Sequence, residues 1–92
     1  MLIAIDYDNT WTADPDFWSR FVTSARLSGH SVVMVTGRKP SMPVPVVGIP
    51  VVYTSNEMKR KAATAAGYSV DVWIDDTPET IGQCIVLDWS ES

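Results

Sequence analysis

Thiol and imidazole groups are nearly absent from this chain, whose 92 residues include one cysteine, Cys84, and one histidine, His30. A single cysteine cannot form a disulfide within the chain, and together with one histidine it cannot build a zinc site of the usual Cys/His kind. Carboxylates, in contrast, are plentiful, since Asp and Glu number 11. The metal chemistry that remains open is therefore that of hard cations held by oxygen ligands.

Long apolar runs and an excess of positive charge are also missing. No run approaches the roughly 20 residues that a membrane span needs, and the chain reaches Asp6 without the basic start of a signal peptide. We therefore expect a cytoplasmic protein with no membrane partner. Lys and Arg number only 7, so the net charge is −4, which argues against nucleic acid as a partner. A phosphorylated substrate stays open, because a bound cation can invert the local field.

Apolar runs and helix signals alternate along the chain. A chain of 92 residues is long enough for one hydrophobic core, so we expect a single domain over residues 1–92. The helix signals are a proline-led cap at 14–16 closed by Gly29, an alanine-rich segment at 56–66 capped by Ser55, and a short helix opened by residues 77–79. This alternation predicts an α/β fold with a mainly parallel, doubly wound sheet of five strands. The expected strands are residues 2–5, 31–36, 51–54, 70–74 and 84–87.

One stretch departs from the alternation. Residues 37–50 contain four prolines, at positions 40, 43, 45 and 50. Proline removes a backbone donor and clashes with the preceding helical turn. We therefore expect an irregular crossover between the second and third strands.

Polar residues collect where the strands end, and in an open α/β sheet ligands bind outside the carboxyl ends of the strands. Carboxylates that converge there would repel one another in a partly desolvated cleft unless a cation is present. Mg²⁺ suits such a site, because it favours carboxylates and phosphate oxygens. The residues concerned are Asp6 and Asp8 after the first strand, Thr36 after the second, Lys59 in the following helix, and Asp75 and Asp76 after the fourth.

Two assignments stay open on the residues alone. Trp11 follows the Asp-rich turn and could pack in the core or form a wall of the substrate site. Lys59 and Lys61 are two positions apart and so lie on different parts of the helix. Lys59 is favoured because it is nearer the helix start and hence nearer the strand ends. Trp18 and Trp73 are expected in the core.

Four segments form a recognisable ordered set: Asp6-Tyr-Asp8-Asn-Thr10, Val33-Met-Val-Thr36-Gly-Arg38, Lys59, and Trp73-Ile-Asp75-Asp76. This set resembles the four motifs of the haloacid dehalogenase (HAD) superfamily of phosphohydrolases. The resemblance covers residues 2–88, nearly the whole chain. It implies a Rossmann-like three-layer sandwich and a phosphohydrolase activity that depends on Mg²⁺.

The resemblance also implies a role for each matching residue. Asp6 would be the nucleophile that forms an aspartyl-phosphate, and Asp8 the general acid and then base. Thr36 would hydrogen-bond a phosphate oxygen, and Lys59 would hold the nucleophile and phosphate charges together. Thr10 would stabilise the turn after the first strand. The implied Mg²⁺ ligands are Asp6, the backbone carbonyl of Asp8, Asp75 and Asp76.

The chain departs from the family in lacking room for the usual cap domain. Between Thr10 and Ser31 there is space for one helix only, and the segment before Asp75 is equally short. The resemblance is therefore to a small, capless member with an open site. Such a site suits a large phosphorylated substrate, or cover from a neighbouring subunit in a homo-oligomer.

Two other functions use a similar set of residues. The chain could be a catalytically silent binding or regulatory module that retains the Mg²⁺ and phosphate site. A receiver-like phosphoacceptor also uses an Asp cluster, Mg²⁺, Thr and Lys, but its acidic pair follows the first strand. Here the acidic pair, Asp75 and Asp76, comes late in the chain, so the receiver layout fits poorly.

Overall fold

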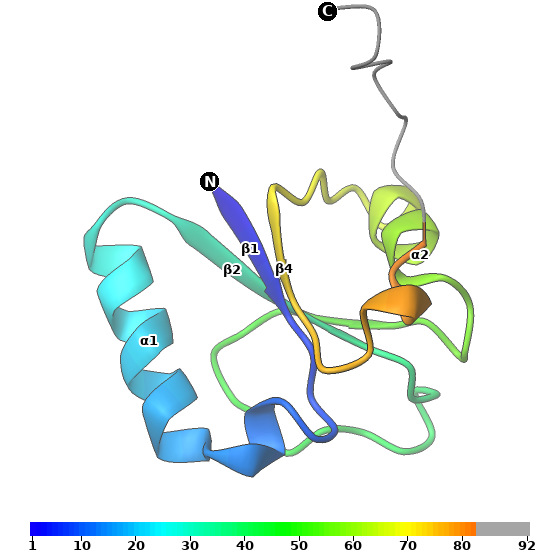
Figure 1. The fold of residues 1–92 in the computed structure, drawn as a ribbon, viewed down its shortest axis with the longest axis horizontal. Coiled ribbons are helices and arrows are strands. Elements are labelled where there is room, and N and C mark those ends of the chain that lie inside the picture. Colours follow the sequence, from blue (N-terminus) through cyan, green and yellow to red (C-terminus); the bar gives the residue numbers. More distant parts are fainter. Residues whose placement is uncertain (83–92) are drawn as a thin grey trace, which may run out of the picture.

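The computed structural model describes residues 1–82 and has the α/β class expected from the sequence (Figure 1). The expected strand at 84–87, and Cys84 with it, lie outside the described residues. Within residues 1–82, no helix has both the length and the apolar character that crossing a membrane requires. The elements in chain order are β1 (Leu2–Ile5), the 3₁₀ helix η1 (Trp11–Ala13), α1 (Pro15–Leu27), β2 (Ser31–Thr36), β3 (Val51–Tyr53), α2 (Lys59–Ala65), β4 (Val72–Ile74) and the 3₁₀ helix η2 (Pro78–Thr80).

The four described strands form one parallel sheet in the order β3-β2-β1-β4. The first strand of the chain therefore lies inside the sheet, paired with β2 on one side and with β4 on the other. In this register Ile5 lies opposite Met34 of β2 and Ile74 of β4. The carboxyl ends of these three strands consequently meet at one edge of the sheet.

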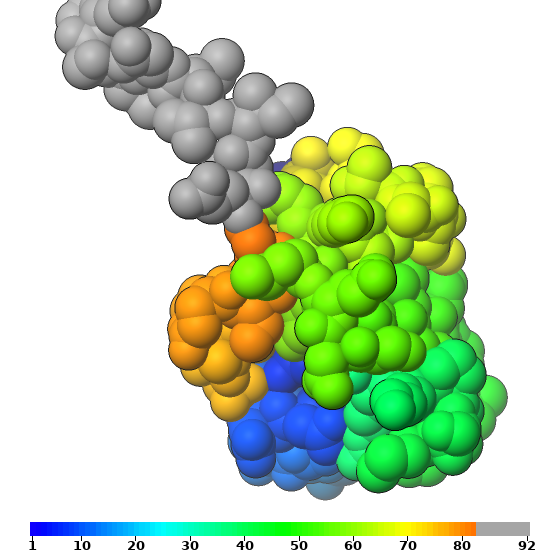
Figure 2. Space-filling view, turned by 90° about the vertical axis from the view of Figure 1, so that its right-hand side faces the viewer, coloured from blue at the N-terminus to red at the C-terminus, as the bar shows by residue number. Residues whose placement is uncertain are grey.

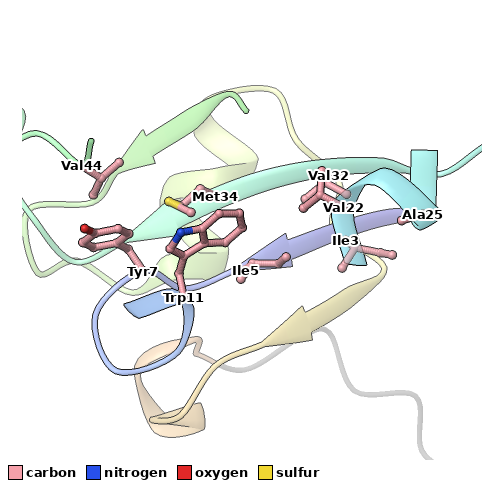
Figure 3. Close-up of a cluster of buried hydrophobic side chains, with 9 residues drawn as sticks. All are labelled: Ile3, Ile5, Tyr7, Trp11, Val22, Ala25, Val32, Met34 and Val44. Carbon is pink, nitrogen blue, oxygen red and sulfur yellow. The ribbon is translucent and has the colours of Figure 1, made fainter. Parts of the chain in front are cut away.

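Alternate residues of β1 and β2 pack on opposite faces of the sheet, which explains why both strands are apolar throughout. Ile3 and Ile5 belong to a buried cluster with α1 (Figure 3). Ala4 belongs to a second cluster, with Ala63 of α2. Figure 1 shows the two helices on opposite sides of the strands. Each face of the sheet is thus covered by one helix.

The predicted capping of α1 is confirmed. The Asp14 side chain accepts a hydrogen bond from the Phe17 backbone N–H at 3.2 Å, and Pro15 occupies the first turn. Gly29, at φ +87°, adopts the left-handed conformation that commonly ends a helix. The start of α1 is not packed as closely as its middle, because Phe17 is 47% exposed whereas Val22 is buried.

The start of α2 differs from the expectation. The helix begins at Lys59 rather than at residue 56, and Ser55 does not cap it. Ser55 and Asn56 have φ values of +52° and +66°, so the chain makes a left-handed turn before the helix. The turn is held because the Asn56 N–H donates to the carbonyl of Gly37 at 3.0 Å. This tertiary contact overrides the local capping signal.

The crossover over residues 37–50 contains no helix and no strand, as the prolines predicted. It is nevertheless anchored, because Val44 is buried in the cluster that includes Tyr7 (Figure 3). The Val44 N–H also donates to the hydroxyl of Tyr53 at 3.2 Å. The loop beside the strand ends therefore has a defined position without regular secondary structure.

Candidate functional site

The candidate site lies at the carboxyl ends of β1 and β4, and backbone pairing brings its first two carboxylates together. The Asp6 N–H donates to the carbonyl of Ile74 at 3.0 Å, so the β1–β4 ladder continues one residue past β1. Asp6 and Asp75 each follow directly on those strands. Their proximity is thus fixed by sheet register rather than by a flexible loop.

A buried lysine joins these two carboxylates. Lys59, which is 5% exposed, donates from Nζ to Asp6 Oδ1 at 2.8 Å and to Asp75 Oδ2 at 2.5 Å. It is the first residue of α2, so the helix start faces the strand ends. Lys61 is exposed. The structure therefore favours Lys59 over Lys61 as the lysine of the site.

The electrostatics of Asp6 reflect competition between burial and pairing. Burial raises the pKa of Asp6 to about 6, although the hydrogen bond from Lys59 opposes the shift. Burial lowers the pKa of Lys59, but its bonds to Asp6 and Asp75 outweigh this and raise the pKa overall. The ammonium group therefore stays charged, and Asp6 keeps its proton to a higher pH than an exposed aspartate does.

Three carboxylates form a set with metal-binding geometry. Oxygens of Asp6, Asp75 and Asp76 lie within 4.8 Å of one another, close enough to share one cation. Carboxylate oxygens are the ligands that hard divalent cations prefer. The burial of Asp6 and Asp75 also makes their negative charge costly without a further counter-charge. This donor set fits a divalent cation but does not by itself select Mg²⁺.

The Asp8 carboxylate is outside this set and is bound by Arg38. The guanidinium Nε and Nη2 donate to the two carboxylate oxygens at 2.9 and 2.8 Å, and the group lies over the ring of Tyr7. The hydrogen bond from Arg38 holds the pKa of Asp8 below its usual value. The expected metal contact of Asp8 was through its backbone carbonyl, and that expectation stays a prediction.

Thr10 links the loops after β1 and β4, a role that sequence reasoning missed. Its hydroxyl accepts a hydrogen bond from the Asp76 N–H at 3.1 Å. The hydroxyl oxygen also lies 3.3 Å from Asp6 Oδ2 and 3.2 Å from Asp76 Oδ1, and it can donate to one of them at a time. Thr10 therefore acts beyond its own turn and connects the two parts of the acidic cluster.

Thr36 is placed differently from the other predicted residues. It is fully buried, and its hydroxyl accepts a hydrogen bond from the Arg38 N–H at 3.3 Å. It is not among the described residues that line the cleft at the site. In this structure Thr36 supports the Arg38 loop, and its contact with a phosphate oxygen stays a prediction.

A cleft of about 610 Å³ opens beside these groups, and both Asp6 and Asp8 line it. In Figure 2 the blue start of the chain lies between the orange segment near residue 80 and the green segments on the other side. Asp75 is set behind the cleft, with its side chain 1% exposed. The other lining residues include Arg38, Lys39, Met42, Asn56, Glu57, Met58, Asp76 and Glu79.

Three tryptophans, Trp11, Trp18 and Trp73, pack against the hydrophobic clusters. Trp11 is buried in the cluster on the α1 face and is not part of the cleft lining (Figure 3). Trp18 and Trp73 are partly buried against the two clusters, as expected for core residues. The walls of the cleft therefore come from other residues.

Family models, curated proteins and solved structures contain no match to this chain. What the site can do chemically follows from its own residues. Asp6 offers a carboxylate oxygen to the cleft, and Asp8 offers a second carboxylate on the cleft wall. Two cations, Lys59 and Arg38, face the four carboxylates of the site. A dianionic phosphate could enter such a site only with additional positive charge.

Proposed function

We propose that this protein is a Mg²⁺-dependent phosphomonoesterase that works through an aspartyl-phosphate on Asp6. The observation that carries the proposal is the grouping of Asp6, Asp75 and Asp76 within 4.8 Å, with Lys59 bonded to the first two. Phosphoryl transfer depends mainly on positioning and on charge neutralisation, which such a grouping supplies. The four ordered sequence motifs support the same proposed function.

In this mechanism an Asp6 oxygen attacks phosphorus as the bond to the ester oxygen breaks. Asp8 gives its proton to the departing oxygen and then takes one from the water that hydrolyses the aspartyl-phosphate. Lys59 keeps the Asp6 carboxylate oriented by donating to Oδ1. The Mg²⁺, held by Asp6, Asp75, Asp76 and the backbone carbonyl of Asp8, would screen the repulsion between the phosphate and its carboxylate attacker.

The wider fold assignment is part of the proposal. The strand order β3-β2-β1-β4, with one helix on each face, agrees with the beginning of a Rossmann-like sandwich. We place the chain among the capless members of the HAD superfamily on this order and on the four motifs. The open cleft is consistent with a phosphorylated substrate that reaches the site without a lid.

One observation favours a second function, a silent module that binds but does not turn over phosphate esters. Arg38 holds both oxygens of Asp8 and lowers its pKa, whereas a general acid must be protonated before it donates. Catalysis therefore requires Arg38 to leave Asp8 when substrate binds. If the ion pair persists, the site can bind phosphate but cannot protonate the leaving group.

The deciding experiment measures release of p-nitrophenol from p-nitrophenyl phosphate with Mg²⁺, with EDTA, and with Asp6→Asn. The phosphatase proposal expects turnover that EDTA and Asp6→Asn each abolish. Asp16→Asn is the matched control, since Asp16 lies in the first turn of α1, away from the cleft. No turnover at any Mg²⁺ concentration, with beryllofluoride still bound, would instead establish the silent module.

A further inference from the structure

The cleft is larger than a phosphate group requires. Its volume of about 610 Å³ falls in the range of about 300–1,000 Å³ that is typical of sites for whole small molecules. Of the acidic cluster, Asp6 and Asp76 line the cleft and Asp75 does not, so the cluster makes up only part of the lining. The remaining wall must therefore contact the part of the substrate that is not phosphate.

Two exposed methionines contribute to that wall. Met42 and Met58 are 59% and 53% exposed, and both line the cleft. Apolar surface left in water is unfavourable, and a ligand that covers it recovers this free energy. Thioether side chains pack well against aromatic rings and adapt to their shape.

Both methionines are presented by anchored backbone. Gly82 lies against Met58, because a Cβ on Gly82 would be 3.3 Å from the Met58 Cβ. The Met42 N–H donates to the carbonyl of Lys39 at 2.9 Å, and Val44 two residues later is buried. Both thioethers are therefore carried at the cleft by anchored backbone, while the side chains themselves remain exposed.

The charges of the cleft disfavour a second phosphate on the substrate. Glu57 and Glu79 line it together with the carboxylates of the site, and Arg38 is already paired with Asp8. Among the described residues of the lining, Lys39 is the remaining exposed cation. A neutral group next to the reacting phosphate suits this wall better than another anion.

We infer that the substrate is a phosphomonoester that carries an aromatic ring system, such as a nucleobase, packed against Met42 and Met58. The inference rests on the proposed function for the fate of the phosphate. It adds the class of group that occupies the rest of the cleft. Sugar hydroxyls would gain little from the thioethers, because sulfur is a weak hydrogen-bond acceptor.

The test compares AMP with ribose 5-phosphate, which share the same scissile primary phosphate and differ in the base. With Mg²⁺ we expect kcat/KM at least tenfold higher for AMP. The ratio should fall several-fold in the Met42→Gln/Met58→Gln double variant and return in Met42→Leu/Met58→Leu. Leu27→Gln is the control, since Leu27 is 84% exposed and outside the cleft. Equal kcat/KM values, or a ratio that the glutamine variant leaves unchanged, would overturn the inference.

A binding arm separates this inference from the proposed function. Calorimetry with Asp6→Asn and Mg²⁺ should give tighter binding of AMP than of ribose 5-phosphate, and the glutamine variant should remove the difference. If the wild-type protein binds AMP in this way but hydrolyses neither AMP nor p-nitrophenyl phosphate, the aromatic site stands and the phosphatase is refuted. If ribose 5-phosphate binds as tightly as AMP, the aromatic site is refuted whatever the activity.

Discussion

At the scale of single residues, the burial of Asp6 gives the protein a pH dependence that can be measured. Its pKa of about 6 lies above the ordinary value of 3.8. Asp6 therefore contributes stability that is fully present below pH 4 and is lost as the pH rises through 6. Without divalent ions, Asp6→Asn should gain stability relative to the wild type over this window, by about 2–3 kcal/mol in free energy of unfolding.

Urea unfolding of both proteins in EDTA, from pH 4 to pH 7.5, gives this difference directly. The ion pair of Asp8 with Arg38 is present in both proteins, so its own pH dependence largely cancels. A difference that stays flat between pH 4 and 7 would mean that Asp6 ionises as freely in the folded chain as in the unfolded one, and a change in the opposite direction would mean that it ionises more readily when folded.

Thr10 offers a second test at the same scale. Thr10→Val keeps the side-chain shape but leaves the Asp76 N–H without its acceptor and removes the bridge toward Asp6. We expect a loss of about 1–2 kcal/mol in the free energy of unfolding, because the substitution removes the hydrogen bonds of the buried Thr10 hydroxyl. Thr10→Ser keeps the hydroxyl and should retain most of this stability. Urea unfolding compares the three proteins, and equal losses in both variants would assign the effect to packing of the methyl group.

At the scale of elements, α1 depends on its cap. Asp14→Ala removes the acceptor of the Phe17 N–H and should cost about 1 kcal/mol. Asp14→Asn also caps well and serves as the matched variant. Thermal unfolding should rank wild type and Asp14→Asn above Asp14→Ala. Activity per folded molecule should be the same in all three, because Asp14 is not in the lining of the cleft.

The two helices show what local sequence can and cannot predict. The cap of α1, with Asp14 followed by Pro15, is satisfied within its own turn, so the pattern located its start. Ser55 carries a capping side chain as well, yet a hydrogen bond between Asn56 and Gly37 turns the chain there. That bond joins segments separated in sequence, and single-segment patterns cannot contain it.

The same distinction holds for the site. The rule that polar residues gather at the carboxyl ends of parallel strands predicted the grouping of Asp6, Asp75 and Lys59. The pairing of Arg38 with Asp8 was not predicted, because it depends on β2 lying next to β1. The position of Arg38 two residues after that strand was the available signal. The buried position of Thr36 also depends on its neighbours in space rather than on its motif.

At the scale of the whole molecule, the candidate site joins the start of the described chain to its end. β1 lies between β2 and β4, so residues of the first loop and of the last described loop share one cluster. At the other end of β4, the Leu2 N–H donates to Asp71 Oδ2 at 2.8 Å, so the start of β1 is also joined to the residue before β4. A cation held by Asp6, Asp75 and Asp76 would therefore connect segments distant in sequence and stabilise the fold as a whole.

Magnesium should accordingly raise the melting temperature of the wild-type protein. A ligand that binds only the folded state at 100 times its Kd adds about 2.7 kcal/mol, and each kcal/mol corresponds to roughly 4–8 °C in a domain of this size. Asp76→Asn, an exposed member of the cluster, should lose most of the shift, whereas Asp16→Asn should keep it. The melts compare MgCl₂ with NaCl at equal ionic strength. An equal shift in Asp76→Asn and wild type would place magnesium binding, and with it the stabilising connection, elsewhere in the molecule.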